Sequence, residues 1–279
     1  MPMHRRPVIL GHQVVGDVDA VGESVTERHI GDRIGMPWLA WADQECRYCR
    51  SERENLCPNA RFTGYDVDGG YAEAVVVDAR FCLPLDPRLD PARTSPLLCG
   101  GLIGWRCLRM AGEAERIGIY GFGSAAHILT QVARARGRRI FAFTRPGDER
   151  GQAFARSVGA EWAGASTERP PEELDAAIVF AAAGEVVPLA LAAVAPGGTV
   201  VCGEIAMTDV PSFPYELLWR ERVLRSVANL TRRDGEEFLA LAAEVGIDTT
   251  VEVIPLDRAN EALDRLRTGG VEGSLVLVP

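Results

Sequence analysis

Residues 117–126, IGIYGFGSAA, decide the fold of this chain. The apolar run at the start predicts a buried strand, and Ala125–Ala135 carries its apolar residues on one helical face. The turn between them, Gly121-Phe122-Gly123-Ser124-Ala125-Ala126, has the G-x-G-x-x-A form of the dinucleotide fingerprint. The first glycine permits the tight turn, the second lets the backbone approach a pyrophosphate, and the alanine allows close packing. We therefore predict a dinucleotide site here rather than a bare glycine turn.

The sequence after about residue 112 alternates short apolar runs with helix-length segments. This alternation is typical of a parallel sheet with crossover helices, so the fold class is α/β with a doubly wound sheet. Helices are expected near 149–158, 186–194, 236–245 and 259–266. The expected strands are Arg139–Thr144, Leu174–Phe180, Thr199–Gly203, Arg222–Asn229 and Leu275–Val278.

The first hundred residues differ from the rest, since they are rich in Val, Gly and Pro and show little helical periodicity. Short alternating stretches, such as Val14–Val21 and Tyr71–Val77, predict β-strands there. The change of pattern marks a domain boundary between a β-rich part and the nucleotide-binding part.

A metal knuckle is predicted within the β-rich part. Cys46 and Cys49 are separated by two residues and Cys57 follows after seven more, which allows three thiolates to converge on one tetrahedral ion. Asp43 precedes them where a fourth cysteine would be expected, and aspartate oxygen is also a zinc ligand. The alternative is three reduced cysteines on a surface loop beside an unrelated aspartate.

The end of the second nucleotide-binding strand bears on the choice of cofactor. NAD-specific sites usually carry an acidic residue there, but this chain has Phe143-Thr144-Arg145, and the first acidic residue is Asp148. The cation of Arg145 and the hydroxyl of Thr144 suit a 2′-phosphate, which favours NADP over NAD. An exposed arginine on an ordinary turn is the alternative.

Composition excludes several classes of function. The 279 residues carry a net charge of −9, which opposes general attraction to nucleic acid or anionic membranes. All 30 basic residues are arginine, so a lysine Schiff base and a P-loop lysine are excluded. Met1–Arg6 lacks the apolar run of a signal peptide and no stretch is suited to span a membrane, so we expect a cytoplasmic protein with reduced cysteines.

Further motifs run through nearly the whole chain: Gly11-His12-Gln13-Val14-Val15-Gly16, Val21-Gly22, Gly31-Asp32-Arg33, Pro37-Trp38-Leu39, Gly69-Gly70-Tyr71 and Leu98-Cys99-Gly100-Gly101. With the knuckle and the fingerprint, the chain resembles the zinc-dependent alcohol dehydrogenases of the medium-chain dehydrogenase/reductase superfamily. The resemblance implies a GroES-like catalytic domain, residues 1–100 and 233–279, around a Rossmann domain, residues 101–232. It also implies a homo-oligomer, through edge strands near Val201 and Arg222–Asn229.

The same resemblance implies the chemistry. His12 and Cys99 match two ligands of a catalytic zinc, Trp38 matches a residue that lines the alcohol pocket, and hydride would pass between a small alcohol or aldehyde and NAD(P). The family's other cysteine ligand belongs upstream of Pro7, and Gln13 stands where glutamate is usual. Two interpretations follow: the sequence lacks its natural start, or this is a shortened, catalytically impaired homologue that retains only structural zinc.

Three other features receive a lesser role. Arg47, Arg50 and Arg53 beside the knuckle allow a zinc-ribbon nucleic-acid binder, which the net acidity disfavours. Arg232-Arg233 could approach a cofactor phosphate, although adjacent arginines usually form a solvated surface. His127, in the fingerprint helix, is expected to pack or to face solvent rather than to catalyse.

Overall fold

The computed structural model describes residues 7–269 and 271–279, so the expectation for Met1–Arg6 lies outside the described residues. The chain divides into two compact units. Unit 1 comprises Met1–Leu102, Asn229–Leu241 and Asp248–Pro279, and unit 2 comprises Ile103–Ala228 and Ala242–Ile247. Two helices, α2 (Gly100–Ala111) and α6 (Arg232–Val245), pass from one unit into the other. The domain ranges expected from the sequence stay a prediction.

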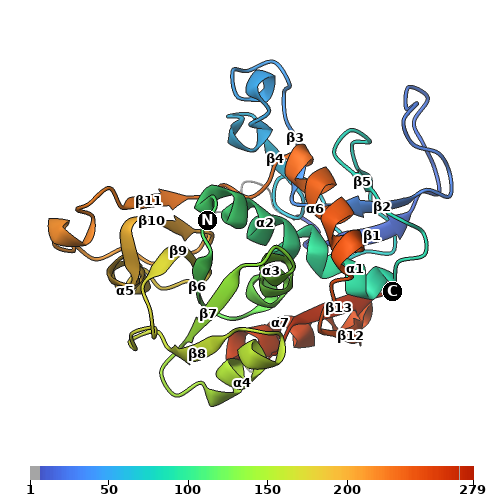
Figure 1. Ribbon diagram of the computed structural model, residues 1–279. Helices are drawn as coiled ribbons and strands as arrows, with labels where there is room; N and C mark the ends of the chain where they lie inside the picture. Colours follow the sequence, from blue (N-terminus) through green and yellow to red (C-terminus); the bar gives the residue numbers. More distant parts are fainter. Residues whose placement is uncertain (1–6, 270) are drawn as a thin grey trace. The chain divides into compact units, whose positions relative to one another are not determined.

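Unit 2 is built on one six-stranded parallel sheet in the order β11-β10-β9-β6-β7-β8 (Figure 1). With these strands numbered 1 to 6 along the chain and the sheet read from β8 to β11, the order is 3-2-1-4-5-6. This is the arrangement of doubly wound dinucleotide-binding sheets. The strands are β6 (Arg116–Tyr120), β7 (Arg139–Thr144), β8 (Trp162–Ala165), β9 (Leu174–Val179), β10 (Val194–Cys202) and β11 (Val223–Ser226). The order therefore places the sheet's switch point between β6 and β9.

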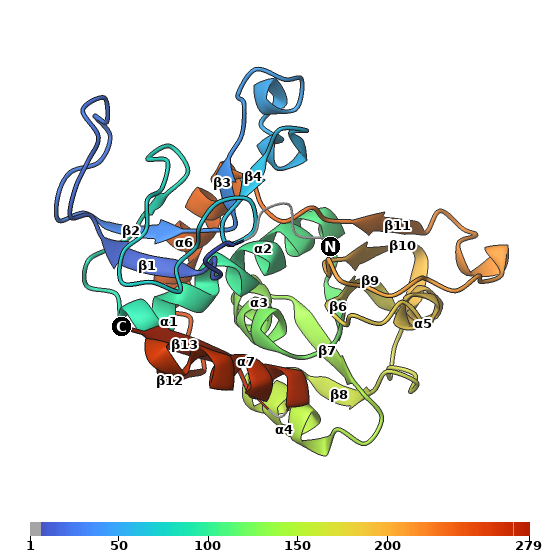
Figure 2. The same ribbon diagram turned by 180° about the vertical axis from the view of Figure 1, so that it is seen from behind.

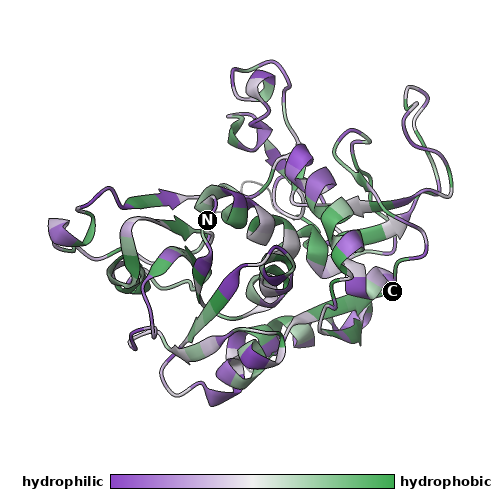
Figure 3. Cartoon of the chain, viewed as in Figure 1, coloured by the Kyte–Doolittle hydropathy of each residue, from purple (hydrophilic) through white to green (hydrophobic). Residues whose placement is uncertain are grey.

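Apolar burial explains why this sheet forms. Ile117, Ile119, Phe141, Ile178 and Val200 are fully buried, as expected for strands covered on both faces. Figure 3 shows hydrophobic residues along the strands and on α5 (Val186–Ala193), whereas α4 (Glu149–Ser157) is mostly hydrophilic. The crossover helix α3 (Ser124–Ala135) packs against β7. The predicted α/β fold with a doubly wound sheet is confirmed.

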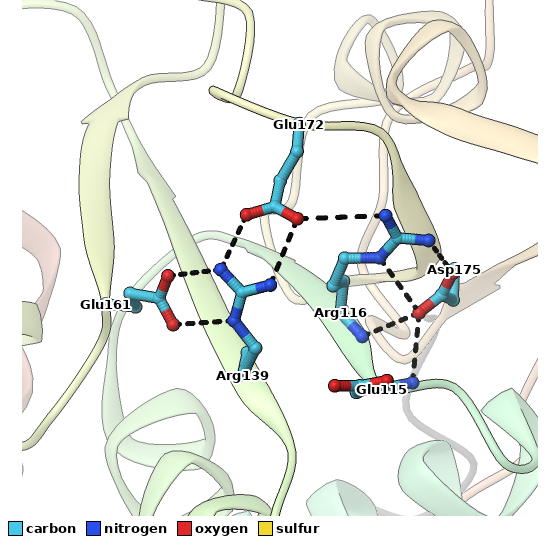
Figure 4. Close-up of polar contacts among 6 residues, drawn as sticks. All are labelled: Glu115, Arg116, Arg139, Glu161, Glu172 and Asp175. Atoms are coloured by element: carbon cyan, nitrogen blue, oxygen red, sulfur yellow. Dashed lines mark hydrogen bonds and ion pairs between the residues drawn. The ribbon is translucent and has the colours of Figure 1, made fainter.

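An ionic network joins the amino ends of the strands in unit 2 (Figure 4). Arg139 binds both Glu161 and Glu172, and Arg116 binds Asp175 with 2.5 Å between Nη2 and Oδ1. Asp175 also accepts hydrogen bonds from the backbone amides of Glu115 and Arg116, at 3.1 and 2.8 Å. Because Arg116 and Arg139 are partners in the β6–β7 register, the carboxylates separate two neighbouring cations.

Unit 1 is assembled from short strands with long connections. Its antiparallel part contains β1 (Val14–Asp17), β2 (Arg33–Met36) and β5 (Leu83–Pro84), and a separate pair contains β3 (Leu39–Trp41) and β4 (Arg61–Phe62). The loop between β3 and β4 carries the short 3-10 helices η1 (Cys49–Ser51) and η2 (Glu54–Leu56) (Figure 1). Short α1 (Pro91–Thr94) and η3 (Ser95–Leu98) precede Cys99.

The carboxyl-terminal part of unit 1 is a small parallel pair of strands with a helix packed on it. The strands are β12 (Val251–Pro255) and β13 (Ser274–Val278), and the helix is α7 (Ala259–Thr268), which follows the 3-10 turn η5 (Leu256–Arg258) (Figure 2). The strand expected at Leu275–Val278 is confirmed, whereas β12 was not predicted from the sequence.

One expected strand is wrong. Tyr71–Val77 alternates in hydropathy but forms no strand, because no strand in residues 7–269 and 271–279 pairs with it, and Val76 is 95% exposed. The strand expected over Val14–Val21 ends early, at Asp17, where the chain leaves its pairing with β2. Among the residues that the structure describes, no helix is long and apolar enough to cross a membrane.

Candidate metal and nucleotide sites

The loop between β3 and β4 brings the four predicted knuckle ligands together. One ligand atom each from Asp43, Cys46, Cys49 and Cys57 lies within 4.8 Å of the others. The Sγ atoms of Cys46 and Cys49 are 3.6 Å apart. Two sulfurs on one tetrahedral zinc, each about 2.3 Å from the metal, lie roughly 3.8 Å apart, so the donor set fits such an ion.

Asp43 is held in place by three hydrogen bonds. Its Oδ1 accepts the backbone amides of Glu45 and Cys46, at 2.9 and 3.0 Å, and its Oδ2 accepts the side-chain amide of Asn59 at 2.9 Å. These donors, the Cys46 amide first, hold the pKa of the Asp43 carboxyl well below its usual range. Asp43 is therefore ionised and oriented in the absence of any metal contact. Sequence reasoning missed Asn59, since a lone asparagine after Cys57 carries no motif.

The three thiols of the knuckle differ in acidity. The backbone amide of Cys49 lowers the pKa of the Cys46 thiol, whereas removal from water raises the pKa of Cys57 and raises that of Cys49 to about 12. A metal ion binds thiolates and so releases their protons. A cation bound in the knuckle would supply the positive charge that stabilises all three cysteines as thiolates.

The second candidate centre is the contact between His12 and Cys99. The Nε2 of His12 lies 3.2 Å from the Sγ of Cys99, although the residues are 87 positions apart in the sequence. Burial lowers the pKa of His12, which favours the neutral imidazole that a metal requires. A nitrogen and a sulfur on one tetrahedral zinc lie about 3.5 Å apart, so the pair fits part of a metal site. Within residues 7–269 and 271–279, no third carboxylate, thiol or imidazole joins them.

Trp38 lies beside this pair. Its ring centroid is 6.3 Å from that of His12, and its other neighbour is Phe62, which stacks on it at 4.3 Å. Trp38 is only partly buried, so it is not an ordinary core residue. Phe62 was not singled out from the sequence, because nothing in a short strand of two residues reveals which aromatic ring it meets. Gln13, the residue after His12, is exposed.

The fingerprint in unit 2 has the geometry that its sequence predicts. Gly121 follows β6 with φ +90°, and a Cβ there would lie 2.7 Å from the backbone nitrogen of Ala181, just after β9. Gly123 caps α3 and has open space around its Cα, so a ligand can approach its backbone. Ala126 is fully buried against its surroundings. Phe122, Ser124 and Ala125 are partly buried around this opening.

The residues after β7 differ in how accessible they are. Thr144 is 4% exposed, and its hydroxyl contacts the carbonyl of Gly164 at 3.5 Å and the Gln152 amide at 3.4 Å. Arg145 is exposed. Asp148 caps α4 by accepting the backbone amide of Gly151 at 2.9 Å. The arginine is thus available to a ligand, while the nearest carboxylate is engaged in the helix cap.

Two residues given a lesser role lie where they serve the fold. His127 is fully buried, with its ring 5.8 Å from that of Phe154. Arg232 contacts the buried carboxylate of Glu54 at 3.3 Å and lies over the ring of Phe81, with Cζ 5.0 Å from the centroid. The knuckle loop is therefore attached to the start of α6 by an arginine that the sequence left as a surface or phosphate-binding residue.

A β-rich unit with a cysteine knuckle, joined to a dinucleotide-binding sheet of this strand order, is the organisation of the medium-chain dehydrogenases/reductases. Residues 1–87 match the model of the alcohol dehydrogenase GroES-like domain. The chain is 42% identical to the probable alcohol dehydrogenase AdhA of Mycobacterium tuberculosis, over 100% of this chain and 82% of that protein. It is 33% identical to an alcohol dehydrogenase of Geobacillus stearothermophilus, over 97% of this chain and 82% of that one.

A solved structure agrees with these relatives. The cinnamyl alcohol dehydrogenase of Sorghum bicolor superposes with a TM-score of 0.88 at 26% identity, over 98% of this chain and 82% of that one. This chain belongs to the zinc-dependent alcohol dehydrogenase family of the medium-chain dehydrogenase/reductase superfamily. The expectations of this family and of an oxidoreductase enzyme are confirmed.

Proposed function

We propose that this protein transfers a hydride between a small alcohol or aldehyde and NAD(P), with the substrate oxygen directed to the metal held by His12 and Cys99. The observation that carries the proposal is the contact of 3.2 Å between His12 Nε2 and Cys99 Sγ, two residues that only the fold brings together. The fingerprint of unit 2, with open space at Gly123, supports the cofactor. Zinc, when bound, acts as a Lewis acid on the substrate oxygen, and the cofactor accepts or donates the hydride.

The residues of the chain have separate tasks in this scheme. Neutral His12 would bind the metal through a ring nitrogen, and Cys99 would bind it through a thiolate. The two ligands together fix the position of the ion. Trp38, 6.3 Å from the His12 ring, would form one wall of the substrate pocket and exclude water from the reacting atoms. Its stacking on Phe62 keeps the indole in one orientation. The wall is aromatic, which favours flat or apolar substrates.

The test is turnover by the purified, zinc-loaded protein. Short aliphatic, allylic and benzylic alcohols are assayed with NAD⁺ and NADP⁺, and the aldehydes with the reduced cofactors. We expect turnover of at least one series, and its loss in His12→Ala with cofactor affinity unchanged. Cofactor binding without turnover of any of these substrates would count decisively against the proposal.

We infer a preference for NADP over NAD from the end of β7. Arg145 is exposed there, and the carboxylate of Asp148 is engaged with the amide of Gly151 as the cap of α4. A ribose 2′-phosphate would find the Arg145 cation there, while the first carboxylate after it in the sequence caps a helix. The hydroxyl of Thr144 is largely buried, so the preference rests on Arg145.

Titration with NADPH and NADH checks this preference. A charge-assisted hydrogen bond contributes about 1.5–3 kcal/mol, so NADPH should bind roughly ten- to a hundredfold more tightly. Arg145→Ala should remove most of that difference and leave the affinity for NADH unchanged. Tighter binding of NADH by the unaltered protein would overturn the inference.

A second function is favoured by the small ligand set at His12 and Cys99. In it, the protein binds NAD(P) and retains zinc only in the knuckle, whose four ligand atoms lie within 4.8 Å of one another. Metal analysis separates the two functions. One zinc per chain, unchanged in His12→Ala, supports this second function, while two zinc ions with one lost in that variant support the dehydrogenase.

We also infer that the protein self-associates through the edge strand β11. Its outer side carries no partner strand among the described residues. The expectation of an edge strand near Val201 is wrong, because β10 is paired on both sides, with β9 and β11. Exposed apolar residues lie before it and at its start: Tyr215 is 69% exposed, Trp219 57%, and Val223, the first residue of β11, 43%. An uncovered edge beside apolar rings is a pairing surface. Sedimentation of the protein should give an oligomer that Trp219→Asp dissociates; a monomer at all concentrations would contradict this.

A further inference from the structure

The segment Phe62–Tyr71 contacts the Trp38 ring at one end and the backbone just before His12 at the other. At one end, the ring of Phe62 stacks on Trp38 at 4.3 Å, and the amide of Thr63 donates to the Trp38 carbonyl at 2.8 Å. The Thr63 hydroxyl also donates to the carbonyl of Pro37 at 2.9 Å. Because Thr63 is 1% exposed, these bonds are shielded from water and fix the backbone of Trp38.

The other end of the segment holds the residues that precede His12. The amides of Gly69, Gly70 and Tyr71 donate to the carbonyls of Ile9, Gly11 and Leu10, at 2.8, 3.0 and 2.8 Å. The Asp68 carboxylate accepts the amide of Ile9 at 3.0 Å. Four hydrogen bonds therefore fix residues 9–11, which directly precede His12, although residues 9–11 belong to no regular strand.

This end of the segment has no room for a side chain. A Cβ on Gly69 would lie 2.0 Å from the carbonyl oxygen of Gly11 and 2.8 Å from that of Leu10. Gly11 itself has φ +95°, and a Cβ there would lie 2.4 Å from the Tyr71 ring. Backbone atoms cannot move aside as a flexible side chain can, so an added methyl group at Gly69 must displace Gly11 and with it His12.

We propose that Phe62–Tyr71 is a positioning element that fixes His12 and Trp38 relative to each other, and that Gly69 determines the geometry of the His12–Cys99 pair. The proposal deepens the proposed function and rests on it for the role of the metal. One short segment would then set both the affinity of the pair for metal and the position of the substrate wall. A substitution at Gly69 should therefore alter both the metal affinity of the pair and the position of Trp38.

The test compares Gly69→Ala with Gly16→Ala. Gly16 lies in β1 of the same unit, and a Cβ there meets nothing within 4 Å. Imidazole NMR of the metal-free protein, which contains four histidines, reports the surroundings of His12. Titration with Co²⁺ reports the metal sites by their thiolate absorption, and alkylation reports the exposure of Cys99.

In Gly69→Ala we expect a shifted His12 resonance, faster alkylation of Cys99 and Co²⁺ affinity of the pair about ten- to a hundredfold weaker, as for loss of a supporting contact around a metal ligand. The Co²⁺ band of the knuckle should stay, which shows that the loop between β3 and β4 keeps its structure. Gly16→Ala should match the unaltered protein in every readout. With turnover measurable, Gly69→Ala should also change the ratio of kcat/KM for benzylic over aliphatic alcohols.

A Gly69→Ala protein with unchanged His12 resonance, Cys99 alkylation and Co²⁺ affinity would refute the positioning role. If that variant fails to fold, Asp68→Ala replaces it, since it removes the bond to the Ile9 amide without placing a methyl group against Gly11. The same shifts, smaller, are expected, and their absence overturns the proposal. Failure of the proposed function is a separate result: no alcohol is turned over, while the NMR and alkylation measurements still decide the role of Gly69.

Discussion

The knuckle and the His12–Cys99 pair both lie in unit 1, yet they depend on the chain in different ways. The knuckle takes its candidate ligands from one loop, Asp43–Cys57, and backbone amides of that loop and of Asn59 just after it hold the carboxylate and two of the sulfurs. The pair joins residues 87 positions apart and relies on Phe62–Tyr71 and on the turn before α2. We therefore expect the knuckle to tolerate substitutions elsewhere in the chain, whereas the His12–Cys99 pair, which the fold assembles, should not.

The largest effect is expected from Cys46→Ser. Loss of the knuckle metal should remove one zinc equivalent and lower the free energy of unfolding by about 4 kcal/mol or more, since a structural metal contributes directly to folding. Denaturant unfolding with metal analysis measures both. If this variant remains folded but also loses the metal of the His12–Cys99 pair, the two sites are not independent.

A smaller effect is expected where the knuckle loop is attached to α6. Glu54→Ala leaves Arg232 without its buried partner, and we expect a loss of about 2 kcal/mol, reduced from the value for a fully buried pair because Arg232 is 38% exposed. The control is Glu52→Ala, which removes an exposed contact with Arg233 and should change the free energy of unfolding far less. Equal losses in the two variants would contradict the anchoring role of Glu54.

A change in unit 2 supplies the baseline for plain destabilisation. Asp175→Asn should cost about 1–2 kcal/mol, because it weakens bonds to Arg116 and to two backbone amides, and should leave the content of both metals unchanged. Loss of zinc in this variant at neutral pH would show that the metal content merely follows overall stability.

The same residue makes stability depend on pH. The Arg116 hydrogen bond lowers the pKa of Asp175, and Arg139 lowers those of Glu161 and Glu172. The unfolded chain therefore binds more protons in acid, so this stabilisation is present above about pH 4–5 and is lost as the pH falls through the folded pKa values. Unfolding measured from pH 6 to pH 3 should show a shallower decline in Asp175→Asn than in the unaltered protein.

The smallest effect on stability is expected from His12→Ala, within about 1 kcal/mol, because the side chain is only partly buried and its loss removes the contact with Cys99. Its effect on the pair should nevertheless be complete: metal there is lost and the knuckle metal stays. Trp38→Leu is the matched control, since it alters the neighbouring ring and should retain both metals. Metal analysis of the two variants decides.

The sequence predicted the parts of the molecule in which neighbouring residues decide the structure. The turn at Gly121–Ala126 and the apolar strands around it need no distant partner to be recognised. The helix α2 was missed because it begins with Gly100 and Gly101, which are poor helix formers; a Cβ at Gly101 would lie 2.4 Å from the ring of Phe238. The glycine is explained only by that packing.

The candidate sites also differ in whether neighbouring or distant residues form them. The knuckle was readable from cysteine spacing, but the pairing of His12 with Cys99 came from family resemblance, because nothing local links residues so far apart. Phe62 and Asn59 could not be found from their types alone, and Gly69 stood only as part of a motif without a role. Their roles depend on what they meet in space: the Trp38 ring, the Asp43 carboxylate and the carbonyl of Gly11.

The hydrogen-bonded carboxylate of Asp43 has a consequence for metal selectivity. One oxygen and three sulfurs give the knuckle the same formal charge as four thiolates, but a harder set of donors. Soft ions such as Cu⁺, which gain most from sulfur, therefore lose part of their advantage over zinc at this loop. The three amides that hold Asp43 keep that discrimination in place before any ion arrives.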